Sequence, residues 1–462
     1  MPGHSGPHRG TARRAECGRL HRRPAQDHQR RPARRSESGR LRDPARRLRP
    51  AEARRGRGAA HPGAARRVGP IGRGRAGRAG RGAMKYVDEF RDGATARQLA
   101  ARIAAEADPK RQYRLMEFCG GHTHAIFRYG IPDLLPANVR LIHGPGCPVC
   151  VMPIGRLDMA IELARRPGVI LCTYGDMLRV PASGRVSLLK ARAEGAAVRM
   201  LYSPIEALKL AQDNPDRDVV FFAIGFETTT PPTALVIEQA QRLGLKNFSV
   251  FCNHVLTPAA MHAILATPEA RAGTLQLDGF IGPAHVSTVI GSDAYAPFPR
   301  QYGTPLVIAG FEPLDLLQAL LMLVRQLNEG RAEVENQFTR AVTAGGNLKA
   351  KALTGRIFEL RESFEWRGLG ALPNSALRIR EAFAEFDAER RFALEARSGL
   401  ENKACECPAI LRGAKSPRDC KLFGNPCSPD NPLGSCMVSS EGACAAWYAY
   451  GRQRQAVVAV AR

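Results

Sequence analysis

The sequence predicts an α/β protein built on parallel sheets with helices on both faces. Two observations support this prediction. From residue 169 onward one unit recurs, in which a short apolar strand ends in glycine or a polar turn and a helical segment follows. Polar residues also gather directly after these strands, at the edge of a parallel sheet where ligands usually bind. The strands suffice for two sheets, and we expect the seam between them near residues 203–217.

The expected elements follow the apolar periodicity of the chain. Residues 95–107 carry one apolar stripe at helical spacing, before the recurring unit begins. Strands are then expected at 169–172, 198–201, 219–224, 248–252, 279–281 and 306–309. The helices between and after them are expected at 233–243, 258–265 and 313–328. After Gly330 the pattern loosens into charged helical segments, followed by a cysteine-rich stretch.

Positive charge is concentrated in the first 83 residues. They contain 24 Arg, no Lys and 5 acidic residues, and they carry +19 of the formal net charge of +25. This leader has almost no large apolar residues, so we expect it to be disordered. Residues 84–90 resemble an ordinary protein start, and we interpret residues 1–83 as upstream sequence translated from a wrongly chosen start codon. A basic arm that binds nucleic-acid phosphates is the alternative, which we do not favour.

The cellular compartment of the protein decides whether its cysteines are expected to form disulfides. No apolar run approaches the about 20 residues of a membrane span, and the leader lacks the apolar segment of a secretion signal. We therefore expect a cytoplasmic protein that does not associate with a membrane. Eleven cysteines follow the leader. In a reducing compartment they are expected to bind metal or to carry out redox chemistry rather than to form structural disulfides.

Two short motifs place thiols on turns in the part of the chain that follows the leader. Cys147 and Cys150 stand at CxxC spacing between glycine and proline residues, which would fix the two sulfurs in one orientation. This arrangement suits a redox dithiol or a part of a metal site, and the spacing does not decide between them. Cys119 precedes paired glycines, and His122 or His124 could accept its proton. The alternative is a packed cysteine with two surface histidines.

Polar residues that follow the strands include Tyr174 to Asp176, Glu227, Asn253-His254, His285 and Glu312. Their common position at strand ends predicts one functional cleft. For Glu227 the alternative role is a helix cap, and for His254 and His285 it is a core histidine with satisfied hydrogen bonds.

The C-terminal cysteines are Cys405, Cys407, Cys420, Cys427, Cys436 and Cys444. The loops between them have too little apolar content to pack alone, so a metal site is expected to crosslink them. Zinc sites usually use two close cysteine pairs, and that regularity is missing. The spacings from Cys407, which are x12, x6 and x16, favour an iron–sulfur cluster. Cys405 and Cys407 compete for the first ligand position, and zinc remains the alternative metal.

Six motifs together resemble the HypD family of nickel–iron hydrogenase maturation proteins. They are CGGHTH at 119–124, GPGCPVC at 144–150, GFETTTP at 225–231, GPAHVSTVIG at 282–291, GFEPLD at 310–315 and MVSSEGACAAWY at 437–448. The resemblance extends from residue 84 to about residue 451. It implies two similar α/β domains facing a cleft, plus a smaller, mainly helical and loop domain that holds an iron–sulfur cluster. We accordingly expect a helical segment at 84–113 that joins the third domain, α/β domains at 114–210 and 211–330, and the iron–sulfur domain at 331–462.

The resemblance also implies a function. Members of the family are scaffolds on which an iron centre with cyanide and carbon monoxide ligands is assembled, together with the chaperone HypC and the cyanide donor HypE, for the large hydrogenase subunit. It implies that Cys119, Cys147 and Cys150 hold this iron or exchange electrons with it. Cys420, Cys427, Cys444 and one of Cys405 or Cys407 would hold a four-iron, four-sulfur (4Fe-4S) cluster.

His122 and Glu227 are hypothesised to give hydrogen bonds or protons to the iron centre. Whether the scaffold is itself an enzyme stays open. The alternative function is a thiol–disulfide oxidoreductase that uses the Cys147/Cys150 dithiol.

Overall fold

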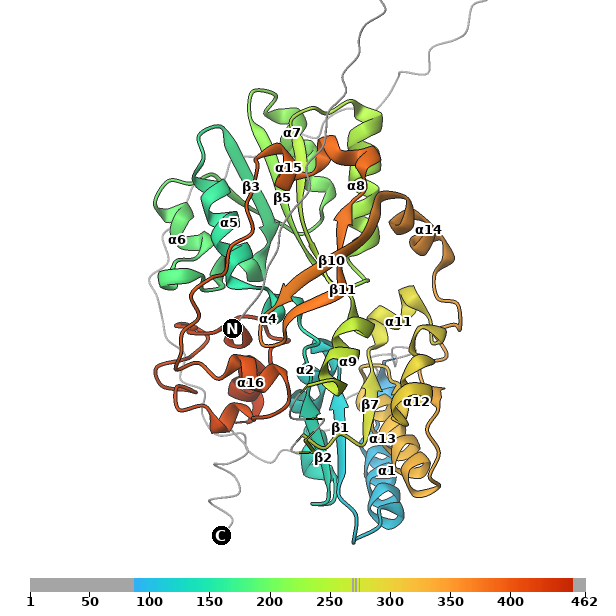
Figure 1. The fold of residues 1–462 in the computed structure, drawn as a ribbon. Helices are drawn as coiled ribbons and strands as arrows, with labels where there is room; N and C mark the ends of the chain where they lie inside the picture. Colours follow the sequence, from blue (N-terminus) through green and yellow to red (C-terminus); the bar gives the residue numbers. More distant parts are fainter. Residues whose placement is uncertain (1–86, 268–269, 271, 274, 452–462) are drawn as a thin grey trace, which may run out of the picture. The chain divides into compact units, whose positions relative to one another are not determined.

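The first of two parallel sheets has five strands in the order β2-β1-β7-β8-β9 (Figure 1). The computed structural model describes residues 87–267, 270, 272–273 and 275–451, so the expectations for residues 1–83 lie outside the described part. The strands of this sheet are β1 Tyr113–Glu117, β2 Val139–His143, β7 Gly279–Gly282, β8 Leu306–Ile308 and β9 Val334–Asn336. Because every pairing is parallel, the carboxyl ends of β1, β2 and β7 lie side by side, with Glu117 opposite His143 and Ile281.

The second sheet has four parallel strands in the order β4-β3-β5-β6. They are β3 Val169–Tyr174, β4 Val198–Leu201, β5 Asp218–Gly225 and β6 Phe248–His254. Every residue of β6 is buried, as are all but the first of β5. These continuous apolar runs are typical of strands covered by helices on both faces. The structure thus confirms an α/β fold with two parallel sheets.

The expected seam between the sheets near residues 203–217 is wrong. The two strands that flank it, β4 and β5, both belong to the second sheet. The chain leaves the first sheet after β2 and returns to it at β7, so sheet membership does not follow the ranges 114–210 and 211–330. The reason is physical: apolar periodicity identifies a strand, but its pairing partners are chosen by packing between segments far apart in the chain.

The helices cover both faces of the sheets, and α1 and α13 pack together against the first sheet. The longer helices are α1 Gly93–Glu106, α2 Gly120–Tyr129, α5 Ile154–Arg165, α7 Ile205–Asp213, α8 Thr230–Leu243, α9 Thr257–Leu265, α13 Pro313–Asn328 and α14 Leu348–Ile357. The shorter ones are α3 Ile131–Leu134, α4 Pro148–Val151, α6 Leu188–Ala193, α11 Ala284–Ile290, α12 Pro297–Tyr302, α15 Ala388–Arg391, α16 Cys407–Leu411 and α17 Ala443–Ala446.

Four expected helices therefore form, as α1, α8, α9 and α13. The bounds of α13 match the expectation because local signals fix both ends: Glu312 and Asp315 form a capping box around Pro313, and Gly330 follows with φ 66°.

The region after Gly330 differs from the mainly helical and loop domain that was expected. β9 completes the first sheet, and a long antiparallel hairpin follows, formed by β10 Phe358–Trp366 and β11 Gly370–Ile379 (Figure 1). Charged residues such as Glu359 and Arg361 occupy the middle of β10, and only Phe358, Phe364 and Trp366 of this strand are buried, which hid the strand among apparently helical, charged segments. The Trp366 indole donates a hydrogen bond to Ser375 Oγ across the hairpin at 2.9 Å.

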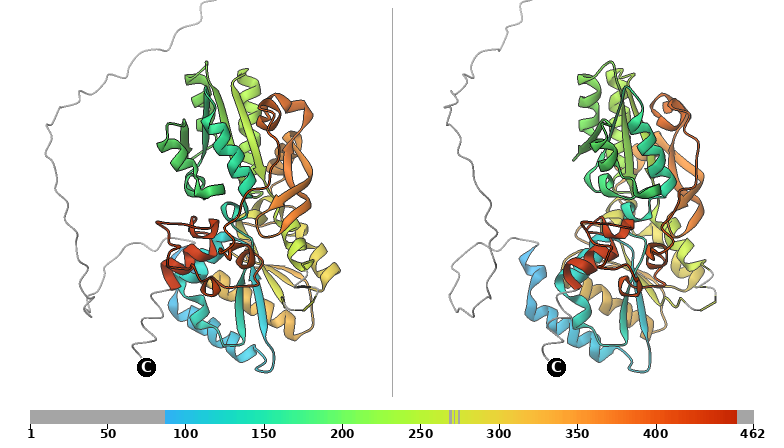
Figure 2. Two further views of the ribbon diagram at one scale, coloured as in Figure 1. Left: turned by 60° about the vertical axis from the view of Figure 1, so that its left-hand side comes forward. Right: turned by 90° about the vertical axis from the view of Figure 1, so that its left-hand side faces the viewer.

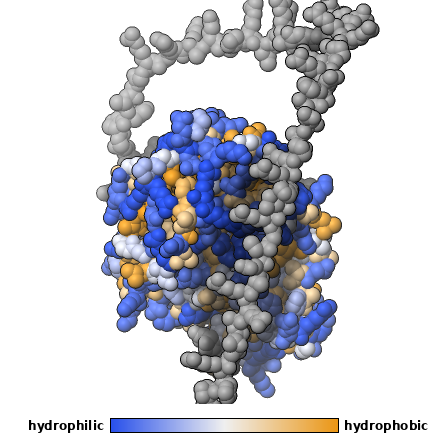
Figure 3. Space-filling view, turned by 45° about the horizontal axis from the view of Figure 1, so that its top comes forward, coloured by the Kyte–Doolittle hydropathy of each residue, from blue (hydrophilic) through white to orange (hydrophobic). Residues whose placement is uncertain are grey.

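The cysteine-rich C-terminal segment packs against the elements that carry the two N-terminal thiol motifs, which are those of Cys119 and of the Cys147/Cys150 pair. α17 contacts α2, and the turn η7 Ser435–Met437 contacts α4. In both views of Figure 2 this segment lies beside the first sheet. The face drawn in Figure 3 is mostly hydrophilic, with smaller hydrophobic areas. Among the described residues, no helix combines the length and the apolar character needed to cross a membrane.

Candidate functional site

A buried carboxylate organises the carboxyl ends of β1 and β2. Glu117, the last residue of β1, is fully buried. Its Oε2 accepts a hydrogen bond from the Cys119 backbone N–H at 3.0 Å, and its Oε1 lies 2.8 Å from His143 Nδ1 and also accepts from the Thr123 hydroxyl. Glu117 therefore fixes the loop that carries Cys119. Glu117 is not among the site residues predicted from the sequence, although an acidic side chain that ends an apolar strand is a usable signal.

Cys119 caps the N-terminus of α2. Its carbonyl oxygen accepts hydrogen bonds from the backbone N–H groups of His122 and Thr123, at 2.9 and 3.1 Å, and the backbone N–H groups at this helix start favour a thiolate. Burial nevertheless raises the pKa of this thiol to about 12, with the nearby carboxylates of Glu441 and Glu117 adding to the effect. Cys119 is therefore protonated at neutral pH, and a bound cation would be needed to displace the proton.

The Cys147–Cys150 loop lies directly beside Cys119. The Gly120 N–H donates to Gly146 O at 3.0 Å, and a side chain on Gly146 would overlap the backbone nitrogen of Cys119. Cys147 caps α4 and forms a disulfide with Cys150. The structure thus brings together three cysteines that two separate motifs supply.

His122 presents an unpartnered nitrogen inside the protein. Its side chain is fully buried, and its Nε2 lies 3.0 Å from Ala309 O. Because a carbonyl only accepts, Nε2 carries the proton and Nδ1 keeps its lone pair. Within the described residues Nδ1 has no hydrogen-bond partner. Burial lowers the pKa of this imidazole, so the ring is neutral and Nδ1 is able to accept a proton or bind a cation.

Glu227 follows β5 and is also buried. It accepts hydrogen bonds from the backbone N–H and the hydroxyl of Thr257, both at 2.9 Å. Burial raises the pKa of this carboxyl to about 7. Glu227 lines a cavity of 1040 Å³ between α9 and the β10–β11 hairpin. The fully buried Tyr295 interacts electrostatically with both Glu227 and Cys119, so these two expected site residues approach the same side chain.

The other polar residues at strand ends have structural partners. His254 lies 2.9 Å from the Thr233 hydroxyl and is a core histidine with satisfied hydrogen bonds, which was the alternative role. Glu312 pairs with Arg91. His285 packs against Phe311, with ring centroids 4.2 Å apart. Asp176, after β3, interacts electrostatically with Glu441, close to Cys119.

Five cysteines of the C-terminal segment gather in a group that we call the thiol cluster: Cys405, Cys407, Cys427, Cys436 and Cys444. Side-chain hydrogen bonds connect Cys407, Cys436 and Cys444. Cys405 hydrogen-bonds to Cys407, and Cys427 interacts electrostatically with both. Donation from Cys407 and Cys444 lowers the pKa of Cys436 to about 5, so one thiolate is stabilised within the thiol cluster.

Membership of the thiol cluster differs in part from the expected ligand set. Cys436 was left out of that set, yet it lies between Cys407 and Cys444. Cys420, which was expected as a ligand, is a buried free cysteine. Among the described residues, no group of three or more His, Cys, Asp or Glu side chains is arranged to hold a metal ion.

One short segment joins the thiol cluster to the two N-terminal thiol motifs. The Ser435 hydroxyl donates to Cys150 O at 2.8 Å. A Cβ atom on Gly442 would lie 3.1 Å from Cys150 Sγ, and one on Gly120 would overlap Glu441. Residues 435–444 therefore contact both the Cys147/Cys150 pair and the Cys119 loop, while Cys436 and Cys444 on the same segment belong to the thiol cluster.

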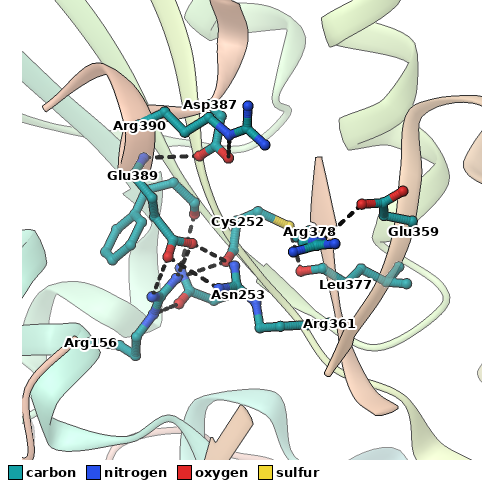
Figure 4. Close-up of polar contacts among 11 residues, drawn as sticks. Arg156, Cys252, Asn253, Glu359, Arg361, Leu377, Arg378, Asp387, Glu389 and Arg390 are labelled. Atoms are coloured by element: carbon teal, nitrogen blue, oxygen red, sulfur yellow. Dashed lines mark hydrogen bonds and ion pairs between the residues drawn. The ribbon is translucent and has the colours of Figure 1, made fainter. Parts of the chain in front are cut away.

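A buried ionic network anchors α5, the helix that follows Cys150 (Figure 4). Arg156 makes two hydrogen bonds to Glu389, at 2.9 and 2.7 Å, and also donates to Cys252 O. Arg361 of β10 donates to the same carboxylate at 2.6 Å. The network ties α5 to β6, to the hairpin and to α15. This network was not predicted from the sequence, because its members are 28 to 233 residues apart.

Comparison with known proteins agrees with the motifs. The family described as "HypD: Hydrogenase formation hypA family" matches residues 94–451. The chain is 93% identical over 379 residues to the hydrogenase expression/formation protein HupD of Azotobacter chroococcum mcd 1, which covers 82% of this chain and 100% of that protein. It is 65% identical over 370 residues to the hydrogenase maturation factor HypD of Cupriavidus necator (80% and 98%). It is 46% identical over 375 residues to HypD of Escherichia coli K12 (80% and 99%).

Proposed function

We propose a scaffold function for this chain. The chain belongs to the HypD family of hydrogenase maturation factors. On the proposed scaffold, the iron centre of nickel–iron hydrogenase acquires its cyanide and carbon monoxide ligands. The iron is the substrate of this process. A HypC-type chaperone and a HypE-type cyanide donor are the proposed partners, and the large hydrogenase subunit is the final recipient. The proposed location is the cytoplasm.

The observation that carries the proposal is the meeting of Cys119 with the Cys147/Cys150 pair beside His122. Thiolates are soft ligands that suit iron bearing strong-field diatomic ligands. Iron binding replaces the S–H proton of Cys119 with an iron–sulfur bond, and the lone pair on His122 Nδ1 is a nearby acceptor for that proton. Cys147 and Cys150 become ligands only after reduction, which adds two electrons and two protons to their disulfide.

The thiol cluster is the proposed site of a 4Fe-4S cofactor. The residues fit this group in donor type and number, because five thiols lie together and Gly434 leaves the space that a Cβ atom would take beside the sulfurs. Cys427, Cys444 and one of Cys405 or Cys407 belong both to the expected ligands and to the thiol cluster, and the fourth ligand is Cys420 or Cys436. When bound, such a group supplies single electrons. Because residues 435–444 contact the Cys147/Cys150 pair, electrons from the thiol cluster would have a short path to this disulfide, which has to be reduced before its cysteines bind iron.

Infrared spectroscopy tests the scaffold function. The chain would be co-expressed with its chaperone and cyanide donor and purified without oxygen. We expect bands of metal-bound cyanide and carbon monoxide that disappear in Cys119→Ala. The matched control is Cys172→Ala, since Cys172 is likewise a buried free cysteine and lies within β3.

The alternative function predicts a different result. A thiol–disulfide oxidoreductase would show no such bands, and Cys119→Ala would leave the redox titration of the Cys147/Cys150 pair unchanged. That combination would reject the scaffold.

A further inference from the structure

The thiol cluster comes closest to the surface at Cys405. The other four members are buried, whereas Cys405 is partly exposed. It lines a cavity of 260 Å³ together with Cys407, Gly434 and Leu400. Because Leu400 is 79% exposed, this cavity opens to solvent. A cofactor held by the thiol cluster would therefore be nearest to solvent at the mouth of this cavity.

An apolar side chain stands at that mouth. The backbone N–H of Leu400 donates to Ser183 Oγ at 2.9 Å, which fixes the loop that carries Leu400. A single exposed apolar residue needs no explanation by itself. Protein interfaces, however, place such residues at their centre and charged residues around them. The residues around Leu400 have this distribution.

The rim around Leu400 is positively charged. Arg185 lies on the cavity wall, and its side chain is exposed, as is that of Lys403. Arg179 and Arg185 donate hydrogen bonds to residues in the loop 429–438. The segment 179–192 is thereby held against the cysteine-rich loops, and it contains four basic residues and no acidic residue.

The two acidic residues nearest to Cys405 in the chain have cationic partners. Glu401 Oε1 lies 3.1 Å from Arg367 Nε, and Glu406 Oε1 lies 2.8 Å from Lys415 Nζ. Each of these pairs contains one positive and one negative charge, so neither cancels the charge of Arg185 or Lys403. The mouth of the cavity therefore combines an apolar centre with a net positive rim.

We propose that the surface formed by Arg185, Leu400, Lys403 and Cys405 docks a small acidic protein that carries single electrons, of the plant-type ferredoxin class. Opposite charges on the two proteins would steer the carrier to the mouth of the cavity. Electron-transfer complexes have small interfaces, so a surface of this size suits such a partner. Nucleic acid is the other polyanion that a basic rim attracts, but it would have no use for the exposed leucine or the thiols beneath it.

The electron balance follows from the state of the Cys147–Cys150 pair. Each reduced carrier gives up one electron and leaves oxidised. Two carriers supply the two electrons that, with two protons from solvent, convert the disulfide to two thiols. This consequence rests on the proposed 4Fe-4S site, whereas the docking of the carrier does not.

Carbodiimide crosslinking tests the docking on the metal-free full chain. The reagent joins lysine amines directly to carboxylates, and residues 1–83 contain no lysine. The chain would be mixed with a plant-type [2Fe-2S] ferredoxin, crosslinked, digested with trypsin and analysed by mass spectrometry. We expect the ferredoxin to be attached at Lys403. The controls are Lys110 and Lys209, which are also exposed but lie before β1 and on α7.

Attachment at Lys110 or Lys209 as often as at Lys403, or no attachment at all, overturns the proposal. A second polyanion gives a separate outcome. If the ferredoxin is not attached at Lys403 but a bromouracil-containing DNA duplex crosslinks to residues 397–421 on irradiation, the surface binds nucleic acid and the proposal is likewise overturned.

Stopped-flow kinetics test the docking on the chain reconstituted with iron and sulfide. Reduced ferredoxin would be mixed with it without oxygen, and the oxidation of the ferredoxin followed by absorbance. Arg185→Glu and Lys403→Glu should each slow this reaction roughly tenfold at low salt. Arg185→Lys, which keeps the charge, and Lys209→Glu should leave the rate unchanged.

Dithionite separates a docking effect from damage to the cofactor, because this small reductant does not need the surface. It should reduce wild type and all four variants at the same rate. If the charge reversals leave the ferredoxin rate unchanged, or slow dithionite equally, the proposal is overturned. If the chain binds no iron, the proposed 4Fe-4S site fails, while the crosslinks still decide on the docking.

Discussion

Replacing Glu389 by glutamine should destabilise the chain by about 3 kcal/mol at pH 7. Glu389 is the shared partner of Arg156 and Arg361 in the buried network of Figure 4, and its side chain is 18% exposed. Burial alone would raise the pKa of this carboxyl, but the hydrogen bonds and charges of the two arginines lower it from 4.5 to about 2. A difference of about 2.5 pKa units corresponds to about 3 kcal/mol. Losing one partner of a buried ion pair costs a similar amount, roughly 3 to 5 kcal/mol.

The pH dependence of this loss has a definite sign. Because the pKa of Glu389 is lowered in the folded chain, its contribution is fully present above 4.5 and is lost as pH falls through about 2. The difference in unfolding free energy between wild type and Glu389→Gln should therefore shrink by about 2 kcal/mol between pH 7 and pH 3.

Urea denaturation of both chains, followed by circular dichroism, measures these differences. The matched control is Glu381→Gln. Glu381 pairs with Arg390 at 2.6 Å, but its side chain is 80% exposed. An exposed pair contributes roughly 0 to 1 kcal/mol, so the control should change little. Equal effects of the two substitutions, or a difference for Glu389→Gln that does not vary with pH, would refute the reasoning.

Three further predictions concern the site. Glu227 has a raised pKa, so its stabilising contribution is complete below 4.5 and is lost as pH rises through about 7. Between pH 5 and pH 8, wild type should lose about 2.5 kcal/mol of unfolding free energy relative to Glu227→Gln, and parallel pH curves would contradict this. Gly434→Ala should lower the iron and sulfide bound per chain, because its Cβ meets two sulfurs of the thiol cluster. Gly355→Ala, which meets open space, should leave metal content unchanged and is the control. Ser435→Ala should cost about 1 to 3 kcal/mol in urea denaturation, because Cys150 O loses its buried donor, and an unchanged midpoint would contradict this.

Local patterns in the sequence determined the elements and the motifs of this protein. The apolar strands from 169 to 309 appear where expected, and α13 begins and ends as its capping residues predict. Backbone periodicity and capping act over a few residues, so they can be recognised in the chain alone. The spacing of the thiol motifs likewise indicated metal or redox chemistry before any contact was known.

Only the tertiary structure decided which of these pieces meet. It paired β1 with β7 across more than 160 residues, made Glu117 the anchor of the Cys119 loop, and put Cys436 in the thiol cluster. It also formed the β10–β11 hairpin from a segment whose charges had suggested a helix. Such contacts depend on the simultaneous packing of side chains from distant segments, and that information is not present in any short stretch of sequence.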